Sequence, residues 1–331
     1  MHELILIFAD LFIAPGASNS QSVPALPALS TLLARGQARF TGDWRGWVLC
    51  EYGGVRAGRL PVAAAARLVT TPELQSASRH WWLATPVHLD AGLTEVRMAD
   101  ELPALDLAER DALVSDFNRL FAAQGLQLDA AGGAADFLIS SPWNDAATID
   151  PFRLSGQNIE AALPTGPDAA QLRRLMTEVQ MWLHDHVVNQ RRAWRGQPTV
   201  NALWIWGGGG ELPVRPAALL PTLATDEPFL VGLWKLWKGP LANPADSFAA
   251  MRVERFASTQ TVLACVAAAR SPAQALETIE RDWMRPALSA LRRGVLRRVR
   301  LHVNDRLFAI SRLDSYRFWR ARSNWLDAVA T

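Results

Sequence analysis

The sequence predicts an α/β fold interrupted by a smaller α+β insertion. The main observation is the opening of the chain. There a fully apolar strand over 3–10 precedes a helix over 26–35, a strand over 47–50 and a helix over 61–69. Strands that alternate with helices are typical of a sheet covered by helices. The helix over 26–35 ends at Gly36, which is a common helix stop.

The insertion is indicated by a change in pattern between about 78 and 141. Short strands surround one helix over 107–123 in this segment. We therefore expect the core domain to comprise residues 1–75 and 200–331, and the α+β insertion domain to comprise residues 76–199.

Composition excludes several classes of protein. The 331 residues are half hydrophobic and one-fifth charged, which is typical of a globular chain. No apolar run approaches the ~20 residues of a membrane span, and the short N-terminal run lacks the basic flank of a signal peptide. Cys50 and Cys265 stand in apolar surroundings, which predicts buried thiols in a reducing compartment. We expect a cytoplasmic protein.

The charge is unevenly distributed. Residues 281–331 contain twelve arginines, no lysine and four aspartates, whereas the net charge of the whole chain is only +2. A basic C-terminal part is compatible with phosphate contacts, but no nucleic-acid motif accompanies it and the remaining chain is acidic. A solvated face or an acidic partner protein is the better interpretation. A hairpin over 298–312, with its turn at Asn304-Asp305, is also predicted.

The stretch 165–216 contains most of the polar candidates. A long helix is predicted from 168 to 189, with a capping-box-like spacing of Thr165 and Asp168 at its start. Along that helix lie the candidate ligand-binding residues Glu178, His184, His186 and Asn189. If the helix is continuous, His184 and His186 point in roughly opposite directions and cannot hold one metal ion.

A buried strand over 200–206 and a run of four glycines follow this helix. Backbone N–H groups of glycines after a strand can approach an anion closely, so Asn201, Gly207, Gly208 and Gly209 are candidate ligand-binding residues. The run lacks the spacing of known phosphate loops, and a tight turn is an equal alternative.

Two further candidates lie at predicted strand ends. Asp10 ends the first strand, and ligands of α/β sheets bind beside the carboxyl ends of strands. His88 follows the strand over 81–87, where it is a candidate ligand-binding residue with a structural role as the alternative.

Several of these segments resemble a known superfamily. The strand ending in Asp10, followed by PALSTLLARG over 27–36, resembles the opening of the alkaline phosphatase superfamily. The segment VNALWIWGGG over 200–209 is similar to one in archaeal-type cofactor-independent phosphoglycerate mutases. Together with 82–89 and 178–189, it also resembles a bacterial family of RpfE-type regulatory, phosphoglycerate-mutase-like proteins. The resemblance implies an alkaline-phosphatase-like core sheet flanked by helices.

The superfamily's phosphoryl transfer uses two metal ions and a Ser or Thr nucleophile. The resemblance makes Asp10 a candidate metal ligand or catalytic residue and makes Ser18 and Ser20 candidate nucleophiles. Asp305 is a second candidate metal ligand, but Arg306 follows it where a metal-binding His is expected. This implies a protein without the two-metal site and without a cofactor.

We therefore expect a regulatory or ligand-binding protein rather than an enzyme. Its partners would be an acidic or phosphorylated small molecule or a regulatory protein. The alternative is an active phosphoglycerate mutase or phosphotransferase that holds Mn²⁺, Zn²⁺ or Mg²⁺ with unusual ligands.

Overall fold

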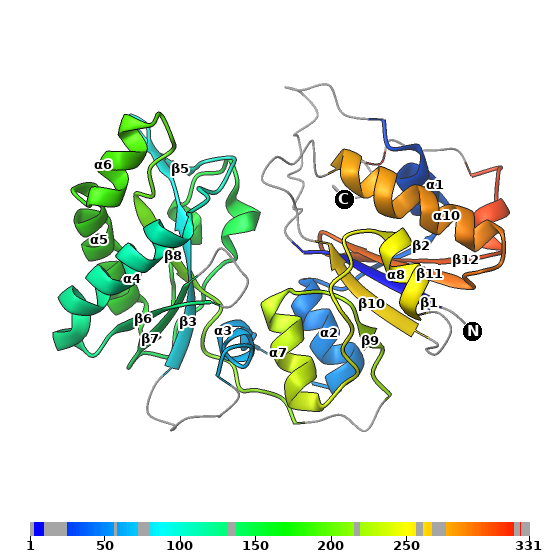
Figure 1. Ribbon diagram of the computed structural model, residues 1–331, viewed down its shortest axis with the longest axis horizontal. Coiled ribbons are helices and arrows are strands. Elements are labelled where there is room, and N and C mark those ends of the chain that lie inside the picture. Colours follow the sequence, from blue (N-terminus) through cyan, green and yellow to red (C-terminus); the bar gives the residue numbers. More distant parts are fainter. Residues whose placement is uncertain are drawn as a thin grey trace. The chain divides into compact units, whose positions relative to one another are not determined.

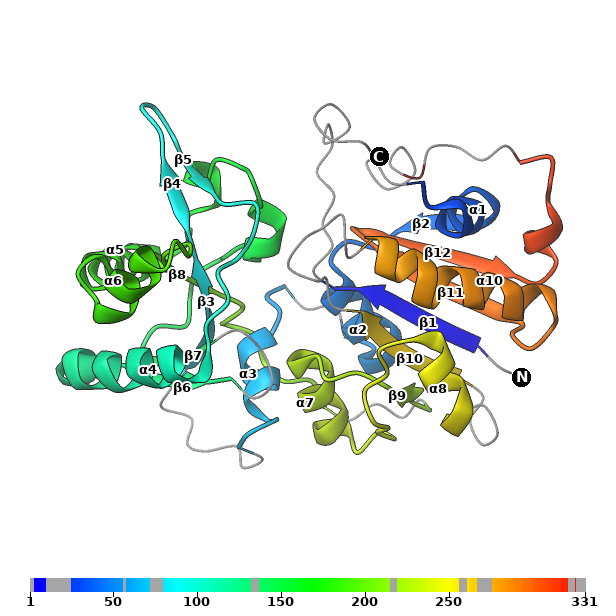
Figure 2. The same cartoon turned by 45° about the horizontal axis from the view of Figure 1, so that its top comes forward.

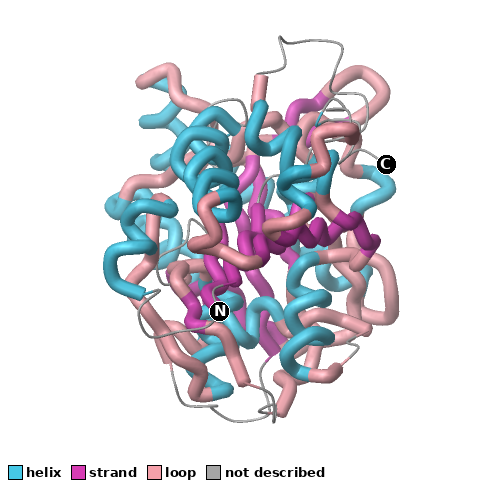
Figure 3. The backbone as a smooth tube through the Cα atoms, turned by 90° about the vertical axis from the view of Figure 1, so that its right-hand side faces the viewer, coloured by secondary structure: helices cyan, strands magenta, loops and turns pink. Residues whose placement is uncertain are grey.

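The computed structural model separates the chain into two compact units. Unit 1 comprises residues 1–56, 214–230 and 236–331, and unit 2 comprises residues 57–213 and 231–235. Figures 1 and 2 show the elements of both units, and Figure 3 distinguishes their helices from their strands. The structure describes residues 3–9, 25–55, 58–71, 80–131, 137–214, 219–255, 261–266, 276–320 and 325.

Unit 1 contains a six-stranded mixed sheet with the order β2-β12-β11-β1-β10-β9. Four neighbouring strands, β11, β1, β10 and β9, are parallel, whereas β12 runs antiparallel to both of its neighbours. The strands are β1 (Glu3–Phe8), β2 (Gln37–Phe40), β9 (Thr222–Leu223), β10 (Thr261–Val266), β11 (Arg298–Val303) and β12 (Arg306–Ser311).

Strand β1 lies at the centre of this sheet. It pairs in parallel with β10 on one side and with β11 on the other, so both of its edges are hydrogen-bonded. Leu4, Ile5, Leu6 and Ile7 have no exposed surface. The continuous apolar run is explained by this position, because a central parallel strand is covered on both faces. The predicted first strand and the predicted hairpin of β11 and β12 are both present.

Helices cover both faces of the unit 1 sheet. On one face lie α1 (Pro27–Arg35), α8 (Phe248–Arg255), the π-helical segment η5 (Ile279–Met284) and α10 (Arg285–Arg292), whose apolar side chains share one buried core with the strands. Figures 1 and 2 show α1 and α10 above this sheet. On the other face lies α2 (Trp44–Gly53), where Trp44 packs edge-on against Phe229 at the start of α7 (Pro228–Trp237). An α/β sheet flanked by helices is thus confirmed.

The prediction of a strand over 47–50 was wrong, because this segment belongs to helix α2. Asp43 caps the helix by accepting a hydrogen bond from the Arg45 amide, and Gly54 ends it in the left-handed conformation. The buried side chains follow helical spacing, and Cys50 falls outside that face. Cys50 is therefore exposed and only Cys265 is buried, which corrects the expectation of two buried thiols.

A buried carboxylate fixes the start of α1. Glu280, on η5, is 2% exposed, and its two oxygens accept hydrogen bonds from the backbone amides of Ala28 and Leu29 at 2.9 and 3.0 Å. Arg285 donates a further hydrogen bond to the same carboxylate at 3.1 Å. A negative charge at a helix amino end is favourable because the first amides lack partners within the helix. Glu280 therefore joins two helices that are about 250 residues apart in the chain.

Unit 2 contains a four-stranded antiparallel sheet with the order β6-β7-β3-β8. A separate two-stranded sheet is formed by β4 and β5. Helices α4 and α5 contact β6 and β8, while α3 contacts β3 and lies on the other side of the sheet (Figures 1 and 2). The strands are β3 (His80–Val87), β4 (Leu89–Ala91), β5 (Val96–Met98), β6 (Gln127–Ala130), β7 (Phe137–Ser141) and β8 (Ala202–Trp206). The helices are α3 (Val62–Arg67), α4 (Leu107–Phe121), α5 (Ala169–His184) and α6 (Val187–Trp194).

The boundaries of the units differ from those expected, which were 76 and 199. Unit 2 extends from 57 to 213 because β8 pairs with β3 of the smaller sheet, rather than joining the sheet of unit 1. Helix α3 also belongs to unit 2, because it packs against β3. In the part of the chain that is described, no helix has both the length and the apolar content to cross a membrane.

We expect the Glu280 cap to contribute measurably to stability. Replacing Glu280 with Ala leaves the Ala28 and Leu29 amides without partners, and should lower the free energy of unfolding by about 2 kcal/mol. Urea denaturation of the full chain measures this change. Glu277→Ala is the matched control, because Glu277 is an exposed carboxylate three residues away. Equal loss in both variants would contradict the capping role.

Candidate functional site

His88 and Asn201 lie together in unit 2, where their side chains interact with backbone groups of neighbouring segments. The Asn201 side chain accepts a hydrogen bond from the Leu89 amide at 2.7 Å and donates one to the Leu89 carbonyl at 2.8 Å. His88 Nδ1 lies 2.8 Å from the Thr199 carbonyl, and its Nε2 lies 3.4 Å from Asp90. The two residues therefore hold β4 beside the start of β8.

The polar residues predicted on one long helix are divided between two helices. Helix α5 ends at His184, and His186 caps α6 by accepting a hydrogen bond from the Val188 amide. The continuous helix was therefore a wrong prediction. His184 is exposed, whereas His186 is buried, with Nε2 at 3.1 Å from an Asp116 carboxylate oxygen. They do not face a common point.

Glu178 and Asn189 also have local partners. Glu178 accepts hydrogen bonds from Arg174 and Gln124, and these two side chains lower the pKa of its carboxyl group. The buried Asn189 amide donates to the Leu183 and Val200 carbonyls at 2.8 and 2.7 Å and accepts from the Val200 amide. Asn189 thus joins α5, α6 and the approach to β8.

The four glycines after β8 are surrounded by protein atoms. A Cβ on Gly208 would lie 2.4 Å from the Trp82 ring, and one on Gly209 would lie 2.6 Å from the Asn144 carbonyl. Gly207 has a φ of +70°, and its amide donates a hydrogen bond to the Thr148 hydroxyl at 3.2 Å. Close backbone approach is therefore required here by packing within unit 2.

Asp168 stabilises the loop beside these glycines. One oxygen of Asp168 accepts hydrogen bonds from the Asp145 and Asn144 amides at 2.7 and 2.9 Å. These two bonds lower the pKa of Asp168 below its usual value. The expected capping box with Thr165 is absent, because Asp168 makes no side-chain cap to α5.

The candidates in unit 2 do not converge on one point. Asn201 and Gly207 stand at opposite ends of β8, about 20 Å apart at the usual rise of a strand. Glu178, His184 and His186 lie on the helices beyond. The predicted ligand-binding residues of unit 2 are therefore spread over two ends of β8 and two helices.

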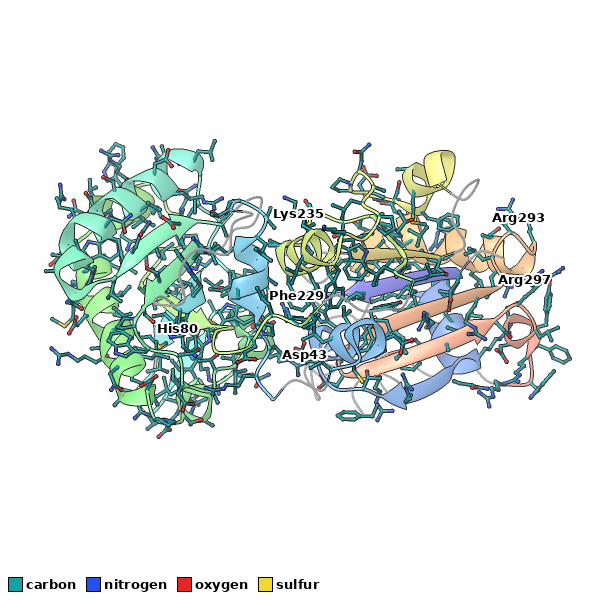
Figure 4. All side chains as sticks on the ribbon, turned by 90° about the horizontal axis from the view of Figure 1, so that it is seen from below. Asp43, His80, Phe229, Lys235, Arg293 and Arg297 are labelled. Carbon is teal, nitrogen blue, oxygen red and sulfur yellow. The ribbon has the colours of Figure 1, made fainter. Side chains whose placement is uncertain are left out.

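In unit 1, the carboxyl edge of the sheet gathers a different set of polar groups. These residues are Thr41, Asp43, Arg45, His302 and Asp305, and we refer to them as the carboxyl-edge cluster. The Thr41 and Gly42 amides donate hydrogen bonds to the Asp305 carbonyl, which places the end of β2 against the turn after β11. Figure 4 shows Asp43 at the start of α2 in this region. This is the position where α/β sheets bind ligands.

His302 lies beneath this edge, on β11. It has no exposed surface, and its Nε2 lies 2.9 Å from the Thr41 hydroxyl. The Trp47 ring covers it, with ring centroids 5.5 Å apart. The Asn304-Asp305 turn is as predicted, with Asn304 at a φ of +51°. Arg306 opens β12 opposite Phe40.

The first turn of α2 supplies buried N–H donors. The Arg45 side chain is 5% exposed, lies over the Trp44 ring at 4.4 Å, and has one nitrogen 3.6 Å from an Asp43 carboxylate oxygen. Trp44 and Trp47 are each 3% exposed, and their indole N–H groups have no hydrogen-bond partner among the described residues. A buried donor without an acceptor costs about 1–3 kcal/mol. Cationic and neutral donors thus dominate this turn.

The described residues do not fit a two-metal centre. Within the described ranges, no three His, Cys, Asp or Glu side chains are placed to hold a metal ion. Asp43 caps α2, and Glu227 accepts a hydrogen bond from the Leu230 amide at the start of α7. The buried Arg45 guanidinium beside Asp43 repels a divalent cation. Asp10, Ser18 and Ser20 lie outside the described residues.

Sequence reasoning missed Arg45, Trp47 and His302. Residues 44–53 were interpreted as containing a strand, so the side chains that α2 directs toward the sheet were not recognised as one helix face. The signal was nevertheless present: Asp43 is a good helix cap, and apolar residues recur at helical spacing until Gly53-Gly54.

Structural comparison identifies proteins with a similar fold. The chain is similar to the PH0037 protein from Pyrococcus horikoshii, with a TM-score of 0.50 and 15% identity over 94% of this chain and 87% of that one. It is also similar to the cofactor-independent phosphoglycerate mutase from Thermoplasma acidophilum, with a TM-score of 0.39 and 15% identity over 99% of each chain. No protein-family model and no curated protein sequence matches the chain. At this identity, the likeness to the Pyrococcus protein shows a shared α/β fold.

We expect Gly208 to be required for packing. Gly208→Ala places a methyl group against the Trp82 ring and should destabilise unit 2 by about 1–3 kcal/mol. Gly58→Ala is the matched control, because a Cβ at Gly58 meets no atom within 4 Å. Urea denaturation followed by tryptophan fluorescence compares the two. Equal stability of both variants would contradict the packing role.

We expect Asp168 to make stability depend on pH. Since its pKa is lowered in the folded chain, its contribution is present above the unfolded value of about 3.9 and is lost as pH falls through the folded value. Asp168→Asn should therefore lower the melting temperature at about pH 6, and the difference from the parent should shrink as the pH falls below about 3.9. Asp185→Asn, at an exposed carboxylate, is the control. A difference that is independent of pH would exclude this role of the charge.

Proposed function

We propose that this chain is a phosphoglycerate-mutase-like protein of the alkaline phosphatase superfamily that has lost the two-metal site. In this proposal it is a cytoplasmic bacterial protein of the RpfE-type regulatory family, and it binds an acidic or phosphorylated small molecule. Support comes from the segments over 27–36 and 200–209 and from an α/β fold shared with the Pyrococcus protein.

The observation that carries the proposal is the buried Arg45 guanidinium on the first turn of α2. It stands at the carboxyl edge of the sheet, with the buried indole N–H groups of Trp44 and Trp47 on the same turn. A guanidinium binds phosphate or carboxylate oxygens through two parallel hydrogen bonds. The indole N–H groups add neutral donors, which can bind an anion but cannot coordinate a metal ion. This chemistry favours an anionic ligand over a metal ion.

The position of Arg306 supports the loss of metal binding. It follows Asp305 where the resemblance leads one to expect a metal-binding His, and Asp305 uses its backbone carbonyl to hold Thr41 and Gly42. The alternative function, an active mutase or phosphotransferase, requires Asp10 and Ser18 or Ser20 to complete a metal centre with other groups.

The proposal predicts phosphate binding that depends on Arg45. Inorganic phosphate and 3-phosphoglycerate should raise the melting temperature of the full chain at constant ionic strength, because a ligand stabilises the state that binds it. Arg45→Gln should weaken binding about tenfold or more, since a charge-assisted hydrogen bond is lost. Isothermal titration calorimetry measures the affinities, and circular dichroism of Arg45→Gln verifies its fold.

Arg39→Gln is the matched control, because Arg39 is an exposed arginine on β2, six residues from Arg45. Equal binding by both variants would refute the role of Arg45. Elemental analysis of the purified protein tests the alternative. Stoichiometric Mn²⁺ or Zn²⁺, together with mutase activity that Asp10→Ala abolishes, would establish the enzyme and overturn the proposal.

A further inference from the structure

An unusual group of apolar side chains is exposed near the amino edge of the unit 1 sheet. Leu313, Phe318 and Trp319 are 82%, 80% and 69% exposed, and Tyr316 is 51% exposed. At roughly 200 Å² for each side chain, these four residues present about 560 Å² of surface. Single exposed apolar residues are ordinary, but a cluster of this size on a monomer commonly marks an interaction site.

Exposed arginines surround these side chains. The Tyr316 hydroxyl donates a hydrogen bond to the Arg292 carbonyl at 2.9 Å, and the Arg312 amide donates one to the Arg297 carbonyl at 3.0 Å. These bonds bring the end of α10, the start of β11 and the segment after β12 together. Figure 4 shows Arg293 and Arg297 at this end of unit 1. The exposed arginines are Arg292, Arg293, Arg297, Arg298, Arg312 and Arg320.

Few negative charges balance these arginines. Asp314 is buried, accepts a hydrogen bond from the Ser311 amide and forms an ion pair with Arg317 at 2.9 Å. The described part of the chain provides no carboxylate partner for Arg293, Arg297 or Arg298. The surface therefore attracts a negatively charged partner, and its field is strongest at low salt.

We propose that this Arg–aromatic patch, formed by Leu313, Tyr316, Phe318, Trp319 and the surrounding exposed arginines, is a docking surface for an acidic protein. Tryptophan, tyrosine, phenylalanine and arginine are the side chains enriched at the centres of protein interfaces. The patch is also ordered in advance, because Tyr316 and Arg317 are held by hydrogen bonds. A surface ordered before binding loses less entropy when the partner docks.

Two other classes of partner fit less well. Phe318 and Trp319 pack edge to face at 5.3 Å, so they do not form the platform on which successive bases of a single strand stack. The apolar residues follow a short 3₁₀ turn, Asp314–Tyr316, whereas peripheral membrane binding commonly uses an amphipathic helix. The proposal does not depend on the ligand site, because the patch and the carboxyl-edge cluster lie at opposite ends of β11.

The test uses a displayed library of random peptides as the probe and the full-length chain as the target. Selected peptides should be rich in Asp and Glu beside bulky apolar residues. Their affinity should fall tenfold or more in two variants, Phe318→Ala with Trp319→Ala, and Arg293→Glu with Arg297→Glu. It should also fall as salt rises from about 0.1 to 0.5 M, because screening weakens the charge contacts.

The matched control is Trp194→Ala with Arg191→Glu and Arg195→Glu. Trp194 is 93% exposed and stands between two exposed arginines on unit 2, so the same chemistry is removed elsewhere. This control should keep the parent affinity. The two proposals fail separately. Phosphate binding that depends on Arg45 without patch-dependent peptide binding would contradict only the docking proposal. Patch-dependent peptide binding without phosphate binding that depends on Arg45 would contradict only the proposed function.

Four results would overturn the docking proposal. The first is selection of peptides without acidic residues, and the second is equal binding by the patch variants and the control. The third is patch-dependent binding to vesicles with 30% phosphatidylserine, or to a 20-nucleotide oligo-dT, that exceeds peptide binding. The fourth is a dimer of the parent chain in sedimentation that the patch variants dissociate, which would identify a second copy as the occupant.

Discussion

The central position of β1 is the constraint on which unit 1 depends. A parallel strand without polar side chains over four residues is stable only when neighbours satisfy both of its edges and helices cover both of its faces. This requirement accounts for α1, α8, η5 and α10 on one face and α2 on the other. It also places the chain segments that follow the parallel strands at one edge, which is why Trp47 and His302 are in contact although they are distant in sequence.

The polar residues of both units illustrate one physical rule. A buried or partly buried polar group is retained when it satisfies backbone groups that would otherwise have no partner. Glu280 does so for the start of α1, Asp168 for the loop at 144–145, and Asn201 for β4. A sequence shows the same residue types at such positions as at ligand sites. Only the partners distinguish a structural carboxylate or amide from a functional one.

The elements that could be predicted from sequence were those set by local pattern. The apolar run of β1, the Gly36 stop of α1 and the Asn304-Asp305 turn each depend on a few adjacent residues. The strand predicted over 47–50 failed because four apolar residues fit a helix as well as a strand. The predicted long helix is broken at His186, because the His186 ring accepts a hydrogen bond from the Val188 amide and contacts Asp116, a residue 70 positions away. The candidate site was predictable only as an edge of a sheet, since the side chains that converge there come from distant segments.

The interrupted layout of unit 1 has a consequence for synthesis on the ribosome. Strand β1 leaves the ribosome well before its partners, because strand β10 begins about 250 residues later. At a synthesis rate of about 5–20 residues per second, both edges of β1 stay unpaired for on the order of ten seconds or more. All of unit 2 is synthesised during this time. An apolar strand with open edges is prone to pair with other chains. The sheet of unit 1 can therefore be completed only after the strands from the last third of the chain have been synthesised.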